Sequence, residues 1–447
     1  MHAIIKKLTP PQLLTVGFLA IILVGSLLLT MPFAHNTNTH VHLIDAIFTA
    51  VSATTITGLT TLQTSSTWTI AGQIIILIMI EIGALGFMTF AVLLFALTGR
   101  RLDLKSRLLA QQALNLKSLS DVKSVLKYVL SLSGIIQLIG AVLLAFDFIP
   151  QFGLVQGIYY SIAHAISAFA NAGFVFFKAP FSQFASNPYV LIVTMFLILA
   201  GSLGFLVWRD ILVAHKGKRV TLHTRLAVVV SAWLIGIGFV GLMISEFFGG
   251  HLPANLSWGN KIIDTLFLAV TPRTAGLEVI PTSSISTAGI MLIIFLMFIG
   301  GTPGSTSGGI KTTTAGILIA QVWASLRGQE SVRFGDRQFS KRTVNKALML
   351  AIVSIIFIFG AAFTLSLTEK LPTGTGLEYF VFEVVSAFST AGLSLGLTPY
   401  LTVFGKIIIM IVMFIGRVGL YTVMFSVLDV QAQATHFEYP EEEVIIG

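Results

Sequence analysis

The fold of this chain is decided by the stretch LIDAIFTAVSATTITGLTTL, residues 43–62, in which a largely apolar segment runs into threonines and a glycine. About a dozen residues precede the threonines, and as a helix they reach about 18 Å, whereas the hydrocarbon core of a bilayer is about 30 Å thick. Such a helix cannot cross a membrane. It predicts a re-entrant segment that stops at small residues and returns extended to the same surface, where protein or a water-filled path must satisfy its backbone.

The composition places this stretch in a membrane protein. Of 447 residues, 55% are hydrophobic and 10% are charged, whereas about a quarter of the residues in a soluble domain are charged. Apolar runs of about 20 residues, the length of a transmembrane helix, begin near eight positions: Leu13, Ile70, Val125, Tyr189, Leu226, Gly289, Ala347 and Phe404. We interpret the first run as an uncleaved span rather than a signal peptide. The absence of cysteine excludes disulfides and thiolate metal sites.

The net charge of +8 is explained by membrane topology. Twenty of the 27 lysines and arginines lie in four segments, 6–7, 100–127, 209–225 and 327–346, and the last three segments each follow a second span. This pattern predicts that both termini are cytoplasmic. We therefore expect no nucleic-acid binding, although the same loops offer a docking face for an acidic partner.

Four segments on the opposite side share one pattern. Each contains an apolar stretch of about a dozen residues that ends at a glycine: Gly58, Gly173, Gly276 or Gly392. A regular repeat of this kind indicates internal duplication. We therefore predict an all-α polytopic membrane protein of four helix–pore loop–helix repeats, with eight transmembrane helices and four re-entrant loops. The predicted boundaries are 1–99, 100–213, 214–326 and 327–430 for the repeats, and 431–447 for an acidic cytoplasmic tail.

The tips of the four loops are predicted to bind a cation. Glycine and small residues let an extended backbone turn its carbonyl oxygens toward a common axis, where rings of such oxygens replace the hydration shell of an ion. The predicted filter residues are Thr55, Ile56, Thr57, Gly58, Ala170, Asn171, Ala172, Gly173, Arg273, Thr274, Ala275, Gly276, Ser389, Thr390, Ala391 and Gly392. The alternative is that these tips are packing turns. Four copies in equivalent places favour the filter.

Several stretches resemble the membrane subunit of bacterial Ktr potassium-uptake systems, in the Trk/Ktr/HKT superfamily, over essentially the whole length. They are SATTITGL (52–59), GFMTFAV (86–92), HAISAFANAGF (164–174), VTPRTAG (270–276), MFIGGTPGSTSGGIKTTT (297–314) and MFIGRVG (413–419). The resemblance implies pseudo-fourfold repeats around one pore, a homodimer in the lipid of the bacterial cell membrane, and a cytosolic ring subunit as regulator. It implies no cofactor in this chain, with nucleotide bound only by the partner.

The third repeat differs from the others after its tip. The second spans contain IGALGF (82–87), AGSLGF (200–205) and IGRVGL (415–420), but the third contains five Gly, one Pro and seven Ser or Thr between residues 300 and 314. A continuous helix is disfavoured there, so we expect this span to break in mid-membrane. The phosphate-loop pattern fails because Ile310 stands where a lysine is needed.

We hypothesise that the broken segment is a gate below the filter, since a polar loop is tolerated at this depth only if it lines a cavity. The alternative is a kink for close helix packing. The predicted gate residues are Gly300, Gly301, Thr302, Pro303, Gly304, Ser305, Thr306, Ser307, Gly308, Gly309, Lys311 and Arg417. An intramembrane arginine is costly, so Arg417 is expected to face the pore as a barrier to cations. The alternative is a structural contact with Glu81 or a helix-end carbonyl, and Lys311 has the same ambiguity.

Arg273 conflicts with a cation filter unless its side chain points away from the pore. We therefore expect only its carbonyl at the filter, with Asp264, Glu278 or Glu383 as candidate partners of the guanidinium. Asp45 is expected to cap a helix or offset its dipole.

These features together predict K⁺ uptake driven by an inside-negative potential, with Na⁺ as a candidate modulator. A transporter of Na⁺ or another monovalent cation is the alternative, followed by a secondary transporter of an organic solute, which would need side-chain contacts at the midplane. An intramembrane enzyme is disfavoured because the spans carry neither H-E-x-x-H nor paired aspartates.

Overall fold

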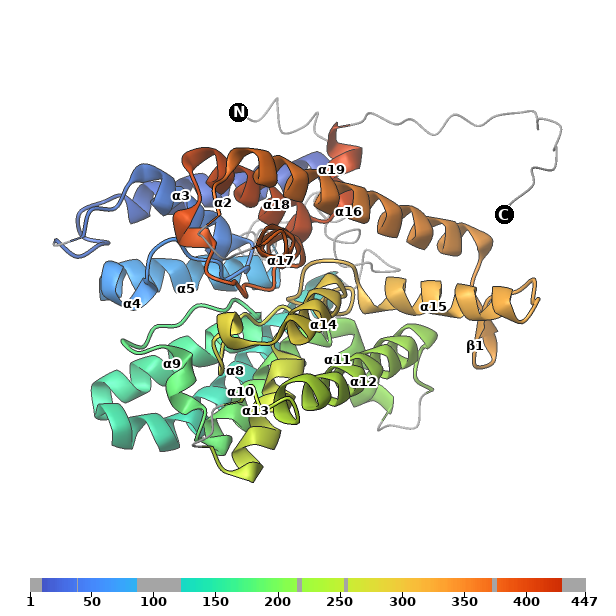
Figure 1. Ribbon diagram of the computed structural model, residues 1–447, viewed down its shortest axis with the longest axis horizontal. Helices are drawn as coiled ribbons and strands as arrows, with labels where there is room; N and C mark the ends of the chain where they lie inside the picture. Colours follow the sequence, from blue (N-terminus) through green and yellow to red (C-terminus); the bar gives the residue numbers. More distant parts are fainter. Residues whose placement is uncertain are drawn as a thin grey trace.

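The structure is a computed structural model that describes residues 10–37, 39–86, 122–214, 219–252, 256–371 and 376–427. It is almost entirely helical (Figure 1). The first half of the described chain contains α2 (Pro10–Leu29), α3 (Leu43–Thr54), α4 (Thr64–Thr67), α5 (Ile70–Leu85), α8 (Val122–Phe152), α9 (Leu154–Ala170), η2 (Phe181–Phe184), α10 (Pro188–Ser202) and α11 (Phe205–Ala214). The second half contains α12 (Leu222–Leu242), η3 (Met243–Phe247), α13 (Trp258–Val270), η4 (Thr282–Ser284), α14 (Thr287–Phe298), α15 (Thr312–Leu326), α16 (Lys341–Thr368), α17 (Glu378–Ser389), η5 (Thr398–Tyr400), α18 (Val403–Val418) and α19 (Leu420–Val427). A small antiparallel hairpin, β1 (Arg333–Phe334) and β2 (Arg337–Gln338), joins α15 to α16.

Short helices follow long ones along the chain. Within the described residues, three helices are long and apolar enough to cross a membrane: Lys127–Phe152, Leu222–Phe247 and Lys341–Thr368. A fourth candidate is the pair α10 and α11, which is bent by 97° at its break. The short helices α3, α9, α13 and α17 have 12, 17, 13 and 12 residues. Most are too short to span a bilayer, as the sequence indicated.

The second helices end earlier than the apolar runs suggested. Gly86 follows α5, Gly204 lies between α10 and α11, and Gly419 lies between α18 and α19, with φ of +80°, +82° and +92°. Glycine adopts this left-handed conformation without steric cost, and it ends an α-helix. The expectation that only the third repeat breaks its second span was therefore too narrow, since a glycine also interrupts α10 and α18. The predicted set of eight spans is not present as eight long helices in the described part.

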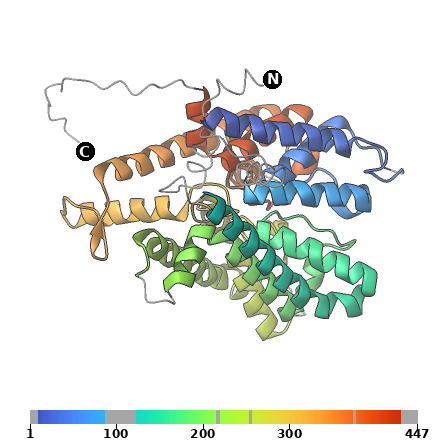
Figure 2. The same ribbon diagram turned by 180° about the vertical axis from the view of Figure 1, so that it is seen from behind.

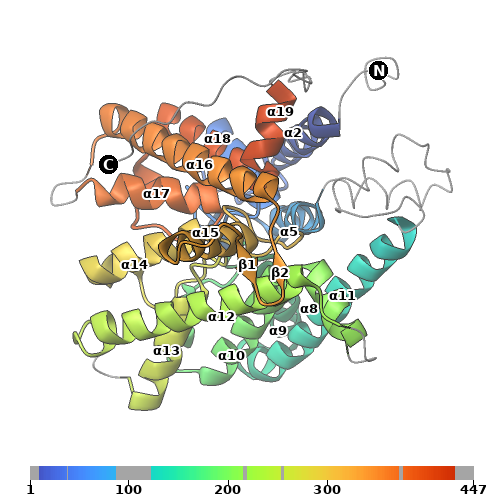
Figure 3. The same ribbon diagram turned by 90° about the vertical axis from the view of Figure 1, so that its right-hand side faces the viewer.

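Each second helix packs against the short helix of the following repeat. The pairs are α5 with α9, α10 with α13, α14 with α17 and α18 with α3, so the last pair returns to the start of the chain. Figures 1 and 3 show the outcome: blue and red helices occupy one half of the molecule, and green and yellow helices occupy the other. From behind, blue α2 and the red helices again lie together (Figure 2).

The start of each second helix uses the same capping contact. Thr69, Asn187, Ser286 and Thr402 each accept a hydrogen bond from the backbone N–H three residues later, at 3.2, 3.3, 3.1 and 3.3 Å. In three repeats, a carboxylate at the end of the first helix also accepts a hydrogen bond from the capping residue. These carboxylates belong to Asp147, Glu246 and Glu369. Such caps satisfy helix-end N–H groups that the bilayer could not.

Candidate functional site

The four tip glycines lie side by side in a closed ring. A Cβ atom placed on Gly58 would lie 3.0 Å from the Cα of Gly173, and one on Gly173 would lie 3.3 Å from the Cα of Gly276. One on Gly276 would lie 3.1 Å from the Cα of Gly392, and one on Gly392 would lie 3.2 Å from the Cα of Gly58. The chain therefore passes once around the ring, and any side chain at these positions would overlap the neighbouring tip.

Carbonyl oxygens lie at the same ring. The Cβ positions on Gly58, Gly173 and Gly276 would be 2.6, 3.1 and 2.6 Å from the carbonyl oxygens of the residues before the next glycine, Ala172, Ala275 and Ala391. The carbonyl oxygen of Thr57 is likewise the atom nearest to a Cβ position on Gly392. Each junction of the ring thus has one carbonyl oxygen beside the neighbouring glycine, and rings of carbonyl oxygens can replace the hydration shell of a cation.

The four tips also share an unusual backbone conformation. Ile56, Asn171, Thr274 and Thr390 have φ of +51°, +57°, +73° and +53°, and they are the only non-glycine residues with positive φ in the described chain. Each lies two residues before its ring glycine. This conformation is costly for β-branched residues, and such strain is concentrated at functional sites. The sequence carried no signal for it, because isoleucine and threonine rarely occupy this region.

Hydrogen bonds to the short helices hold the tips. The N–H groups of Thr57, Ala172 and Ala391 each donate to the carbonyl five residues earlier, in all three cases at 2.8 Å. The third repeat differs, because Ala275 donates to Thr271 at 2.9 Å and the Thr271 hydroxyl donates to Leu277 at 2.7 Å. Since the N–H groups point back to the helix ends, the neighbouring carbonyls are free to face the ring.

A cavity of about 490 Å³ opens on one side of the ring. All four ring glycines line it, together with residues of the segments that follow them in each repeat. Its charged lining residue is Glu278, and its polar lining includes Thr60, Ser394 and Thr398. The distribution of basic residues predicts that these segments lie on the external face.

The predicted gate segment forms a buried loop between α14 and α15. It begins and ends with a pairing of Ile299 and Ile310, and Thr302, Thr306 and Ser307 are at most 1% exposed. The Thr302 N–H donates to the Ser202 carbonyl at 3.0 Å, and the Phe205 N–H donates to the Gly304 carbonyl at 3.0 Å. The loop is therefore joined to the break between α10 and α11 in the second repeat.

The same loop contacts two of the four tips. The Asn171 side-chain amide shares hydrogen bonds with the hydroxyls of Thr306 and Ser307, at 3.1 and 3.2 Å. Cβ atoms placed on Gly308 and Gly309 would meet Thr390 and Ser389, respectively. Two glycines thus allow the loop to approach the tip of the fourth repeat closely. The loop residues predicted to form the gate therefore lie together, in contact with the predicted filter residues.

Arg417 joins the loop to the first repeat. Its guanidinium donates to the carbonyl of Thr306, to that of Gly83 at 2.5 Å and to that of Ala84 at 3.3 Å. Glu81 accepts instead from the Gln137 amide, at 3.0 and 3.2 Å. Of the structural alternatives, the structure therefore contains the helix-end carbonyl contact and not the pairing with Glu81. Lys311 also donates to a loop carbonyl, that of Ser307, at 2.5 Å.

Arg273 points away from the ring, as expected, but its partner differs from the expected ones. The guanidinium is 1% exposed and donates to the hydroxyl of Ser231 on α12 at 2.9 Å. The candidate carboxylates have other environments: Thr282 donates to Glu278, Ser394 and Thr398 donate to Glu383, and both oxygens of Asp264 lack a hydrogen-bond partner in the described structure. A hydroxyl on a helix about 40 residues away could not be identified from the sequence.

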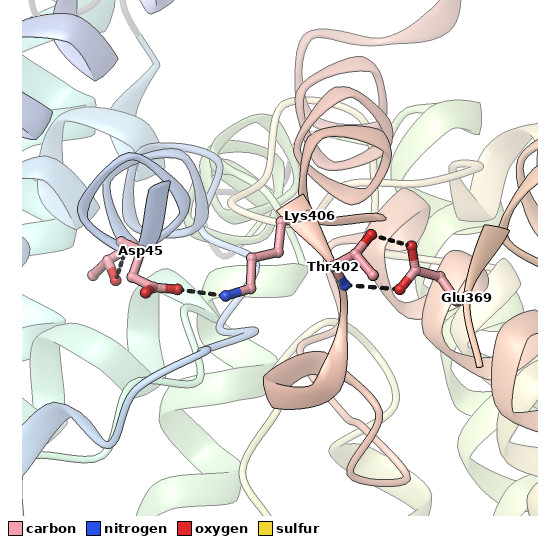
Figure 4. A network of polar contacts seen from close by, with 5 residues as sticks. Asp45, Glu369, Thr402 and Lys406 are labelled. Carbon is pink, nitrogen blue, oxygen red and sulfur yellow. Dashed lines mark hydrogen bonds and ion pairs between the residues drawn. The ribbon is translucent and has the colours of Figure 1, made fainter. Parts of the chain in front are cut away.

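Asp45 lies in the first turn of α3 and forms an ion pair with Lys406 on α18, with Nζ 2.7 Å from Oδ1 (Figure 4). It is the only ion pair found among the described residues. In the same figure, Thr402 at the start of α18 bonds Glu369 through both its N–H and its hydroxyl, at 2.7 and 2.6 Å. Lys406 is not among the residues predicted from the sequence. Its position near the external end of an apolar span was the available signal.

The chain is similar to known cation transport proteins. The family model described as TrkH, cation transport protein, matches residues 11–438. The potassium/sodium uptake protein NtpJ of Enterococcus hirae is 44% identical over 443 residues, which cover 99% of this chain and 98% of that protein. The Ktr system potassium uptake protein B of Bacillus subtilis is 38% identical over 441 residues, covering 99% and 97%. The crystal structure of the potassium transporter TrkH from Vibrio parahaemolyticus matches with a TM-score of 0.69 at 20% identity, covering 92% of this chain and 84% of that one.

Proposed function

Because the chain belongs to the TrkH family of cation transport proteins, we propose that it takes up potassium ions across the cell membrane through the ring of tip carbonyls. The family resemblance inferred from the sequence motifs is confirmed, and the chain is a multi-pass, mostly helical membrane protein. The names of NtpJ and of the Bacillus subtilis protein both describe potassium uptake.

The observation that carries the proposal is the closed ring of four glycines with a carbonyl oxygen at each junction. A cation of fitting size would exchange its hydration shell for these oxygens, and the strained residues two positions earlier would hold the oxygens in place. An inside-negative potential contributes about 2.3 kcal/mol per charge per 100 mV, which supports inward movement without an energy-coupling site. We therefore propose no catalytic function and no cofactor in this chain.

The proposed architecture is four helix–pore loop–helix repeats in pseudo-fourfold arrangement around one pore, with the sequence-based boundaries and cytoplasmic termini. The cyclic packing of each second helix on the next short helix supports it, as does the common capping contact at the start of each second helix. The C-terminal tail, 431–447, lies outside the described residues.

The proposed gate is the loop 299–311 with Arg417. Support comes from the contacts of this loop to the tips of the second and fourth repeats and, through Arg417, to α5 of the first. A homodimer and a cytosolic nucleotide-binding ring are the proposed assembly. The name of the Bacillus subtilis relative, which assigns it to a Ktr system, supports a partner subunit, and the basic segments after the second spans offer it a docking face.

Sodium is the second candidate ion, as substrate or modulator. The name of the Enterococcus hirae relative includes sodium, and the four tips have only their glycine in common. An organic solute is disfavoured, because backbone and small residues form the ring and offer no side-chain contacts for such a substrate.

Proteoliposomes test the proposal directly. The purified full chain should take up Rb⁺ and K⁺ when an inside-negative potential is imposed, faster than empty liposomes, and unlabelled K⁺ should compete. The same vesicles measured with Na⁺ establish the preference, and addition of a candidate ring partner with nucleotide tests regulation. No cation flux above that of empty liposomes, with or without the partner, would contradict the proposed function.

A further inference from the structure

The mouth of the ring is electrically asymmetric although its backbone is repeated. Of the described residues that line the 490 Å³ cavity, only Glu278 is acidic or basic. It lies two residues after Gly276, and the equivalent positions in the other repeats are occupied by Thr60, Val175 and Ser394. Burial raises the pKa of the Glu278 carboxyl, and hydrogen bonds from the Thr282 side chain and the Ser394 backbone act in the opposite direction. The third repeat therefore places one carboxyl group where the others place neutral side chains.

Hydrogen bonds hold this carboxylate at the wall between the third and fourth repeats. The Thr282 hydroxyl donates to Glu278 Oε1 at 2.8 Å. Glu383 on α17 is fully buried and accepts hydrogen bonds from Ser394, at 2.7 Å, and from Thr398. Both hydroxyl-bearing residues also line the cavity.

The wall on the second repeat, which neighbours the third repeat in the ring, has a different character. The second repeat contributes the apolar residues Val175, Phe177 and Phe181 to the cavity. Lys178 lies between Phe177 and Ala179 and is exposed, and its carbonyl accepts a hydrogen bond from Gln63 of the first repeat. The cavity therefore has an acidic side on the third and fourth repeats and a basic residue at its rim on the second.

We propose that Glu278 concentrates monovalent cations in the external cavity and thereby sets the cation concentration at which uptake is half-maximal. The proposal rests on the proposed function of the ring. A fixed charge in a cleft with low-dielectric walls raises the local concentration of counter-ions. Glu278 is not among the ring residues. Its charge therefore changes the cation concentration in the cavity and leaves the maximal rate of passage through the ring unchanged.

The test uses the full chain in proteoliposomes and measures the KM and maximal rate of Rb⁺ uptake. Glu278→Gln keeps the side-chain shape and the acceptor for Thr282, and it is expected to raise KM about fivefold at low ionic strength. The maximal rate should stay that of the unmodified chain. Glu278→Asp, which keeps the charge, should restore most of the affinity.

Ionic strength and a charge of opposite sign provide the matched controls. N-methylglucamine chloride, raised from about 10 to about 300 mM, should screen the carboxylate and raise the KM of the unmodified chain toward that of Glu278→Gln. Lys178→Gln removes a positive charge at the rim and should lower KM slightly.

Three results would overturn the inference. They are a KM of the unmodified chain that does not change with ionic strength, a Glu278→Gln variant with unchanged KM, and a Glu278→Gln variant in which only the maximal rate is reduced. The first needs no variant, so misfolding cannot obscure it. Absence of Rb⁺ uptake by the unmodified chain would instead count against the proposed function.

Discussion

The four tips and the ends of the second helices that follow them differ in how closely the repeats resemble one another. The tips have the same backbone, with a left-handed residue two positions before a left-handed glycine in each repeat. The second helices start with the same capping contact but end differently. Gly86 follows α5, Gly204 and Gly419 separate α10 and α18 from the short helices α11 and α19, and the third repeat inserts a loop from 299 to 311. In the proposed function, every repeat contributes a backbone oxygen to the ion site, whereas a single segment that crosses the pore is enough to close it.

The contacts of the two regions differ accordingly. Each tip is held mainly by its own short helix and touches the next glycine. The third-repeat loop instead bonds α10, the second tip and, through Arg417, α5. The ring therefore depends on close approach of identical units, and the loop depends on contacts among different units.

Substitution of one ring glycine is the strongest test of this equivalence. Gly392→Ala places a methyl group against the Thr57 carbonyl and forces a non-glycine residue to φ +79°. Overpacking and strain of this kind cost several kcal/mol together, so Rb⁺ uptake should fall by about tenfold or more. Radiotracer uptake in proteoliposomes measures the loss.

Gly396 is the matched control for backbone strain. It has φ +93° but no atom within 4 Å of an added Cβ. Gly396→Ala should retain much more uptake than Gly392→Ala. Equal losses in the two variants would show that strain, rather than closure of the ring, limits uptake.

Weakening the loop contacts should have a smaller effect with the opposite sign. Arg417→Gln removes the donors to the carbonyls of Thr306 and Gly83, and each such hydrogen bond from a charged group contributes about 1.5–3 kcal/mol. Uptake should rise severalfold because the loop is released from α5. Deletion of several residues from 302–308 should raise it further. Unchanged or reduced flux in both variants, with normal expression, would contradict a gating role of the loop.

Breaking the ion pair between the first and last repeats should have the smallest effect on flux and a clear one on stability. Lys406→Met leaves Asp45 buried without its partner, which should lower stability by about 3–5 kcal/mol. The Tm in detergent measures this change. Adding Asp45→Asn should recover part of the loss, as a coupled pair requires. Additive losses would show that the two side chains act independently.

Much of the site could be inferred from local sequence. Glycines 58, 173, 276 and 392 were identified because each follows an apolar stretch too short to span a membrane. The loop at 300–314 was identified by its Gly, Pro, Ser and Thr content. The additional breaks at Gly204 and Gly419 were not identified, because the apolar composition continues through both of them. The partner of Arg273 was not identified either, because a serine on another helix has no distinguishing pattern.

By itself, the sequence determined which segments are helical, which are too short to cross a bilayer and where glycine permits a close turn, because these properties depend on neighbouring residues. Only the tertiary structure decided that the four turns meet in one ring, that Ile56 and its three counterparts adopt a left-handed conformation, and that Asp45 pairs with Lys406 at a separation of 361 residues. These features arise when packing of distant repeats outweighs local conformational preference.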